Sequence, residues 1–313
     1  MNKNIFYITI FLFGIFIFSY FLPTTTSSNR EKREILSTTV MIDSLVREIV
    51  DDKFFVQLLI EGEIDPHSYQ LRKGDKEKIE RAEIVFGNGL SLEHNPSLYY
   101  MLIDKKAVFV GDCLLESAPK SIITNHREVD PHIWMDLDLM QMVAQIICDT
   151  VCEKDPQNGE LYKANTIALQ EKMKLLDQEI TEMFKNVPAD NLYLVSSHDA
   201  FNYFVRKYFI DDSKNRLFSM QGLSTESEVS LKRIQQVIEY IRTNNISVVF
   251  FESNLPKDGL YKVIEICSRF GLNVKISQDP LYGDTLGGMT YLEMMRHNAS
   301  VLTKNLKKDG SDD

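Results

Sequence analysis

"DPQNGELYKANTIALQEKMKLLDQEITEMFKNVP", residues 155–188, is the stretch that decides the fold. Apolar residues recur in it at spacings of four and three, and they form one stripe of a helix: Leu169, Met173, Leu176, Ile180, Met183 and Val187. The pattern predicts a helix from about Pro156 to Asn186, roughly 45 Å long at 1.5 Å per residue, which Pro188 ends. A single helix of this length is a rigid rod, so it would hold the segments on either side in a nearly fixed relation.

Short β-rich segments alternate with amphipathic helices on both sides of this stretch. Before it, predicted strands lie at 34–40, 54–60, 83–88 and 107–111, and predicted helices at 41–50, 74–82 and 136–153. After it, strands are predicted at 192–197, 216–220, 246–251 and 273–276, and helices at 200–209, 227–245, 257–271 and 287–306. Such alternation is typical of parallel sheets built from βαβ units.

We therefore predict an α/β fold with two lobes of parallel sheet flanked by helices, joined by one long rigid helix. The N-terminal lobe would span residues 35–154, the linking helix 155–187 and the C-terminal lobe 190–313. The length of 313 residues suits two domains or one large one. The net charge of -10 argues against nucleic acid as a partner, because binding to phosphates needs a basic face.

The N-terminus carries an uncharged apolar run, Ile5 to Leu22, after Lys3. It has two interpretations: a secretory signal peptide within residues 1–28, or an uncleaved membrane anchor, since 18 apolar residues are just enough to span a bilayer. Either one predicts export, and we expect a periplasmic location. The first cysteine is Cys113, so the sequence does not support a lipoprotein anchor.

The four cysteines are Cys113, Cys148, Cys152 and Cys267. Cys148 and Cys152 are four residues apart in a helical pattern and share a face, a spacing that suits a metal with partners elsewhere. No matching pair follows, so we expect these two cysteines to act as small buried apolar residues.

Two short segments match in their first five residues, Glu, a β-branched residue, Asp, Pro and His: "EIDPHSY", residues 63–69, and "EVDPHIW", residues 128–134. The similarity does not extend beyond them, which argues against an internal repeat. Pro66 and Pro131 fix the backbone, so each loop can hold its histidine, His67 or His132, in place. The aspartate before each proline is placed to accept the second imidazole N–H.

Further candidate ligands follow strands of the second series, where ligands of open α/β sheets bind. His198 comes directly after a predicted strand in "SSHDAF", and "SQDPLYGDTLGG" after the last strand holds Asp279 and Asp284. Three imidazoles and one carboxylate make a complete set of ligands for Zn²⁺, Mn²⁺ or Fe²⁺. For any one of these histidines, a surface or capping role is the competing interpretation.

Eight pieces, taken together and in order, resemble the receptors for Zn, Mn and Fe of ABC transporters, the ZnuA/TroA-like solute-binding proteins. They cover nearly all of residues 35–305: "GEIDPHSYQL", "FGNGLSLEHN", "DPHIWMDL", the long helix, "SSHDAFNYF", "FFESN", "LYGDTLGG" and "YLEMMRHNASVL". The resemblance implies two α/β lobes with the metal between them, and it maps the ligands onto His67, His132, His198 and Asp284. Asp279 lacks the family context and is expected to be structural.

Several other residues near these motifs are interpreted as non-ligands. Glu252 is expected to support a ligand rather than bind metal, and Trp134, the single tryptophan, to pack its loop. His94 and His297 fall at variable places of the family motifs, and His126 is expected to lie at the surface.

The resemblance narrows the cargo to a divalent transition metal without naming it. Zinc-dedicated members often carry a long His/Asp-rich loop, which is short here, and His198 stands where manganese-dedicated members commonly have Glu. Zn²⁺ and Mn²⁺ are favoured, and Fe²⁺ is compatible with the same donors.

The function expected is that of a monomeric extracytoplasmic receptor, not an enzyme, that passes its metal to a membrane permease with a cytoplasmic ATPase. We expect metal affinity to fall as the pH drops through about 6.5, because the ligands must be neutral imidazoles. The alternatives are a metallohydrolase using Glu252 or Asp279 as base, and an adhesin or structural module that needs no metal. No HExxH helix, nucleophile elbow or phosphate loop is present to support a hydrolase.

Overall fold

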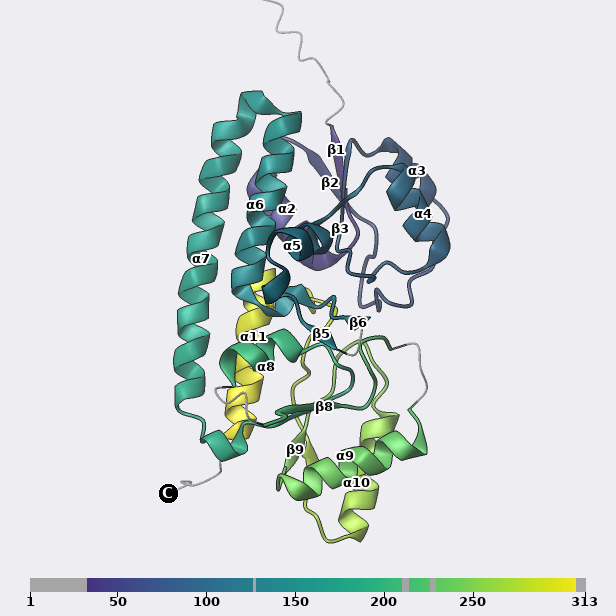
Figure 1. The fold of residues 1–313 in the computed structure, drawn as a ribbon, viewed down its shortest axis with the longest axis vertical. Coiled ribbons are helices and arrows are strands. Elements are labelled where there is room, and N and C mark those ends of the chain that lie inside the picture. Colours follow the sequence, from purple (N-terminus) through teal and green to yellow (C-terminus); the bar gives the residue numbers. More distant parts are fainter. Residues whose placement is uncertain (1–32, 126–127, 210–213, 226–228, 308–313) are drawn as a thin grey trace, which may run out of the picture. The chain divides into compact units, whose positions relative to one another are not determined.

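A four-stranded parallel sheet forms the centre of the N-terminal half in the computed structural model, which describes residues 33–125, 128–209, 214–225 and 229–307. Its order is β2-β1-β3-β4, and Figure 1 labels β1, β2 and β3. The strands are β1 (Glu34–Ser37), β2 (Phe55–Leu58), β3 (Ile84–Gly87) and β4 (Val108–Phe109). A short antiparallel hairpin of β5 (Thr124–Asn125) and β6 (Glu128–Val129) follows this sheet in the chain.

The helices of this half are α2 (Val40–Val50), α3 (Asp75–Arg81), α4 (Pro96–Asp104), α5 (Val110–Ser117) and α6 (Leu137–Lys154). The sequence patterns predicted α2, α3 and α6 but not α4 or α5. The strand predicted at 107–111 is too long, because α5 already begins at Val110. The backbone N–H of Gly111 donates to the carbonyl of Asn88 at 2.7 Å, which ties the chain to the loop after β3 instead of extending β4. A short apolar run is compatible with either structure, so periodicity alone does not separate them.

The C-terminal half repeats the parallel arrangement with shorter strands. Its strands are β7 (Leu194–Ser196), β8 (Leu217–Ser219), β9 (Val248–Val249) and β10 (Lys275–Ile276), paired as β7 with β8 and β9 with β10. A hydrogen bond of 2.8 Å from the N–H of Phe250 to the carbonyl of Val195 places the segment after β9 beside β7. The helices are α8 (Asn202–Tyr208), α9 (Leu231–Thr243), α10 (Asp258–Arg269) and α11 (Tyr291–Leu306).

The long helix is α7, Gly159–Lys185, with 27 residues. The first turn of the predicted helix is instead a 3₁₀ turn, Pro156–Asn158. Helix α7 packs against α6, α2 and α11, and Figure 1 shows it running beside α6 and then beside α11. The predicted stripe is buried at Leu169, Met173, Leu176 and Ile180, and Phe184 continues it where Met183 is only partly buried.

One apolar cluster joins the two halves. It includes buried residues of both sheets and of α2, α6, α7, α8 and α11. The long helix is therefore part of a shared core, and the predicted α/β fold with two lobes of parallel sheet and a long connecting helix is confirmed.

The four cysteines are free thiols: Cys148 is buried as predicted, whereas Cys152 is only partly buried, contrary to the prediction; Cys267 is buried and Cys113 partly buried. None of the helices in the described ranges combines the length and apolarity needed to cross a membrane. The predicted signal peptide or anchor, residues 1–28, lies outside the described part of the chain.

Candidate metal centre

The structure brings the four predicted ligands together. His67, His132, His198 and Asp284 each offer one ligand atom, and these atoms all lie within 4.8 Å of one another. The residues are 4%, 0%, 0% and 3% exposed, so the cluster is closed off from solvent. His67 lies in the loop after β2, His198 after β7 and Asp284 after β10, while His132 follows the β5–β6 hairpin.

The separations between ligand atoms suit a small cation. His67 Nε2 lies 3.2 Å from His132 Nε2, and His198 Nε2 lies 3.2 Å from Asp284 Oδ2. The Asp284 carboxylate is also 3.6 Å from His132 Nε2 and 3.9 Å from His67 Nε2. A tetrahedral ion with bonds of about 2.1 Å separates its ligand atoms by about 3.4 Å. The four separations differ from this value by at most about 0.5 Å, and no two ligand atoms are more than 4.8 Å apart.

His132 is held by the aspartate of its own motif. Asp130 Oδ1 accepts hydrogen bonds from the backbone N–H of His132 at 2.9 Å and from its ring Nδ1 at 2.7 Å. The other oxygen accepts from the side chain of Asn202 at 2.9 Å. Because Nδ1 is engaged, the tautomer is fixed and the lone pair of Nε2 is directed into the cluster.

The matching expectation for the first motif is wrong. Asp65 Oδ1 accepts from the backbone N–H of His67 at 2.8 Å, but its other oxygen accepts from the hydroxyl of Thr225 and not from the imidazole. Asp65 therefore fixes the loop rather than the ring. The same tripeptide therefore supports its histidine in two different ways.

His198 is supported by Glu252, as expected. Glu252 Oε1 accepts from the backbone N–H of His198 at 2.9 Å, and Oε2 lies 2.7 Å from the ring Nδ1. Gly283 leaves room for this pair, because a Cβ there would lie 2.1 Å from Glu252 Oε2 and 2.9 Å from His198 Cε1. The indole N–H of Trp134 donates to the carbonyl of Gly283 at 2.6 Å, which positions the loop that carries Asp284.

His67 Nε2 and His132 Nε2 lie within hydrogen-bond distance of each other, but ligand atoms of the other two residues lack aligned hydrogen bonds within the described part of the chain. Among the described residues, both carboxylate oxygens of Asp284 and both ring nitrogens of His198 are buried without an aligned hydrogen bond. His198 Nδ1 and Nε2 have carboxylate oxygens within ion-pair distance, but not with hydrogen-bond geometry. Buried polar atoms are almost always satisfied, so a group of them converging on one point indicates a site for a cation.

Charge in the cluster is distributed unevenly. Burial, only partly offset by the charge of Asp284, lowers the pKa of His67 to about 4. Burial also disfavours the charged form of His198, but Asp284 and Glu252 outweigh it and hold the pKa of His198 well above its usual range. Burial opposes ionisation of Asp284 too, yet His198 keeps the pKa of that carboxyl well below its usual value. At neutral pH the metal-free cluster therefore pairs an imidazolium of His198 with the Asp284 carboxylate.

Other histidines and acids singled out in the sequence lie outside the cluster. Asp279 is exposed, 3.7 Å from Lys304 Nζ, and His297 Nε2 lies 2.9 Å from the carbonyl of Pro280. His94 approaches the site, with its ring centroid 6.5 Å from that of His67, but its Nδ1 lies 3.3 Å from the carbonyl of Ser91. His126 lies outside the described residues.

The sequence analysis missed the role of Glu93. Its buried carboxylate accepts from the hydroxyl of Thr38 at 2.6 Å and from the backbone N–H groups of Asn88 and Gly89 at 2.7 and 3.0 Å. The amide of Asn88 then donates to the carbonyl of Pro131 at 3.1 Å, next to His132. A glutamate in a Gly-containing loop after a strand is the only sequence signal, and it does not reveal which backbone groups the carboxylate accepts from.

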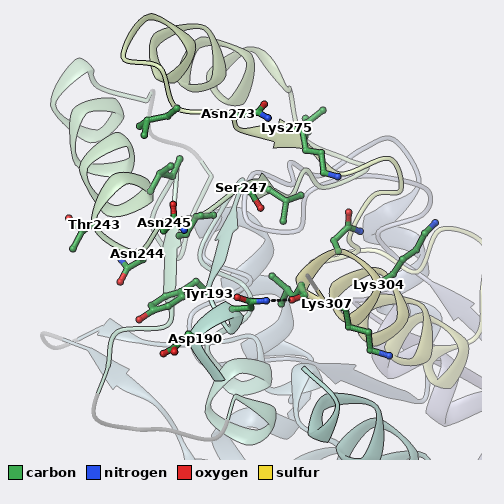
Figure 2. Close-up of a pocket in the computed structure, with 18 of the residues that line it drawn as sticks. Asp190, Tyr193, Thr243, Asn244, Asn245, Ser247, Asn273, Lys275, Lys304 and Lys307 are labelled. Carbon is green, nitrogen blue, oxygen red and sulfur yellow. Dashed lines mark hydrogen bonds between the residues drawn. The ribbon is translucent and has the colours of Figure 1, made fainter. Parts of the chain in front are cut away.

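A pocket of the C-terminal half is separate from this centre. It is lined by amides and lysines such as Asn244, Asn273, Lys275 and Lys304 (Figure 2), and by none of the four predicted ligands.

The fold and the cluster define a two-lobed receptor for a metal ion. Residues 35–305 match the ZnuA family model, described as zinc-uptake complex component A, periplasmic. The chain belongs to this family of metal-binding receptors of ABC transporters, as its motifs predicted.

Individual relatives support the assignment along nearly the whole chain. The metal-binding protein YtgA of Chlamydia trachomatis is 33% identical over 300 residues, which cover 91% of each chain. Its Fe(III)-bound crystal structure matches with a TM-score of 0.83 over 88% of this chain and 98% of that chain. The periplasmic zinc-binding protein TroA of Treponema pallidum matches with a TM-score of 0.82 at 26% identity, over 88% of this chain and all of the other. The manganese ABC transporter substrate-binding lipoprotein PsaA of Streptococcus pneumoniae is 26% identical over 95% of this chain and 96% of its own.

Proposed function

We propose that His67, His132, His198 and Asp284 bind one divalent transition metal as cargo. The observation that carries the proposal is the convergence of buried ligand atoms, including both oxygens of Asp284, that have no aligned hydrogen bond among the described residues. Three imidazoles and a carboxylate suit Zn²⁺ and Mn²⁺ first, and Fe²⁺ is compatible. The relatives are named for zinc and manganese, and one was crystallised with Fe(III); imidazole and carboxylate groups can bind all of these metals.

The receptor would act outside the cytoplasmic membrane as a monomer and pass its metal to an ABC permease driven by a cytoplasmic ATPase. Four protein ligands fill a tetrahedral shell, which favours holding the ion over using it for catalysis. Neither base considered for a hydrolase supports that alternative: Glu252 is engaged with His198, and Asp279 lies at the surface near Lys304. The boundaries of the lobes proposed are 35–154 and 190–313, with 155–187 as the linking segment.

The test is metal binding by native mass spectrometry and by chelator competition, before and after treatment with EDTA. We expect one Zn²⁺ or Mn²⁺ per chain, and we expect His67→Ala and Asp284→Ala each to weaken binding at least about 100-fold, since even the partners of metal ligands contribute 10–100-fold. His297→Ala is the matched control, because this histidine contacts Pro280 outside the cluster. Full binding by both ligand variants would show that the assigned site is wrong.

A further inference from the structure

Glu63 connects the two halves of the chain beside the metal centre. Its Oε2 accepts hydrogen bonds from the hydroxyls of Ser253 and Thr285, both at 2.7 Å. Glu63 belongs to the loop after β2, whereas Ser253 follows β9 and Thr285 follows β10. One carboxylate oxygen thus joins three loops from two sheets.

Each of these contacts lies next to a residue of the metal centre. Glu63 is in the loop that carries His67, Thr285 directly follows Asp284, and Ser253 directly follows Glu252, which supports His198. A movement of the β2 loop away from the C-terminal half would separate His67 from Asp284, and it would have to break both hydrogen bonds of Glu63.

The position of Glu63 suits a closing contact. The side chain is exposed, whereas His67 and Asp284 are almost fully buried, so water reaches the contact of Glu63 but not the ligands beside it. The same loop has a second contact with the C-terminal half, from the hydroxyl of Thr225 to Asp65. All three hydrogen bonds are accepted by carboxylate oxygens, so each bond is charge-assisted, but Glu63 accepts two of these bonds from the C-terminal half and Asp65 accepts one.

The apolar core shared by both halves restricts their movement, so we expect metal release to involve a local movement of loop 61–67. Apolar residues of both halves and of α7 form one cluster, so a wide separation of the halves would expose a large apolar area. Loop 61–67, by contrast, is held to the C-terminal half by polar contacts that water can replace.

We propose that Glu63 is a latch: a positioning residue that keeps the His67 loop closed over the bound metal and sets the rate at which the metal leaves. The latch consists of Glu63, Ser253 and Thr285. This inference rests on the proposed function, because it assigns a role to residues around that same centre.

The test is the rate of metal release, measured by stopped-flow mixing of the metal-loaded protein with excess EDTA. Glu63→Ala removes both hydrogen bonds that the carboxylate accepts. We expect metal release to become about tenfold faster, because hydrogen bonds to a charged group stabilise the closed loop by enough to slow its opening by that factor. Glu63→Gln keeps an acceptor oxygen without the charge, so an intermediate rate is expected. Glu61→Ala is the matched control, because Glu61 lies in the same loop and pairs at 2.7 Å with Lys78 of its own half; its release rate should equal that of the unmodified protein.

A double-mutant cycle distinguishes a latch from general loosening. Thr285→Val should also accelerate release, and Glu63→Ala combined with Thr285→Val should be no faster than Glu63→Ala alone, because both changes remove the same contact. Release from Glu63→Ala at the unmodified rate, or fully multiplicative effects in the double variant, would overturn the latch. Should Glu63→Ala fail to fold, Ser253→Ala and Thr285→Val carry the same test.

The latch and the proposed function fail in different ways. If the unmodified protein binds no metal, the proposed function falls. If it binds metal in a manner that needs His67 and Asp284, but Glu63→Ala does not change release, the latch alone is wrong.

Discussion

At Gly283, beside the candidate metal centre, the structure has no room for a side chain. An added Cβ would lie 2.1 Å from Glu252 Oε2, well inside van der Waals contact. Glu252 would have to move, and the backbone N–H of His198 would lose its acceptor. The absence of one side chain therefore allows the loop that carries Asp284 to approach His198.

We expect Gly283→Ala to lower metal affinity about 10–100-fold, because the support of His198 is disturbed while all four ligands remain. Overpacking should also cost about 1–3 kcal/mol of the free energy of unfolding. Chelator competition and thermal melts measure the two effects. Gly222→Ala is the control, since a Cβ there meets no atom within 4 Å. Equal affinities of the two variants would contradict the role given to Gly283.

The raised pKa of His198 sets the pH dependence. Metal binding must displace the proton that Asp284 and Glu252 hold on His198, so affinity should already fall at pH values above 6.5, by about tenfold per pH unit for one displaced proton. The stability of the metal-free protein should change in the opposite direction. Because folding raises the pKa of His198, protonation of this residue stabilises the fold below pH 6.5, and this stabilisation is lost as the pH rises through the folded-state pKa. Calorimetry in buffers of different ionisation enthalpy counts the released proton. Affinity that stays constant between pH 8 and 6.5 would be incompatible with this charge arrangement.

The sequence predicted the members of the centre but not all their supports. His67 and His132 were recognisable because each follows an Asp-Pro pair, and Asp130 supports His132 as expected. Asp65 does not support the ring of His67, and the role of Glu93 was missed. Such contacts depend on how loops from distant segments meet, which short motifs do not record.

Among the elements, α7 was predictable because its apolar stripe recurs over many turns. The exposure of two neighbouring leucines shows which side of α7 faces the core: Leu176, in the stripe, is 2% exposed, and Leu175, outside it, is 57% exposed. Helices α4 and α5 were missed although the shorter α3 was predicted, because each contains a short apolar run, and such runs do not distinguish helix from strand.

We expect Leu176→Ala to lower the free energy of unfolding by about 2–5 kcal/mol, through lost burial and a cavity next to α7. Leu175→Ala, the neighbouring control, should change it by less than about 0.5 kcal/mol because this side chain is at the surface. Urea denaturation of the metal-free protein measures both. Similar losses for the two variants would mean that the stripe does not face the core.

On the scale of the whole described part of the chain, the shared core limits how far the halves can move. The apolar cluster includes buried residues of both sheets and of α7 and α11. A wide hinge motion would have to break this cluster, so metal capture and release are expected to involve loops.

We therefore expect a small change in size when metal binds. For residues 33–313, small-angle scattering should show the radius of gyration changing by less than about 1 Å, against about 19 Å for a folded chain of this length. The metal-free and metal-saturated protein would be compared at one concentration, with His67→Ala plus metal as the control. A compaction of several ångströms would show that the halves close as bodies.

The distribution of the ligands along the chain has a consequence for biosynthesis. His67 lies in the first quarter of the sequence and Asp284 in the last tenth. A chain that is still being made can present His67 and His132 but cannot close the proposed coordination shell. Bound metal stabilises only the state that binds it, so the gain is available only to finished molecules with both halves folded. Binding at the proposed site would thereby favour finished molecules, and a truncated or half-folded receptor, which presents fewer of the four ligands, would hold metal less tightly than intact copies.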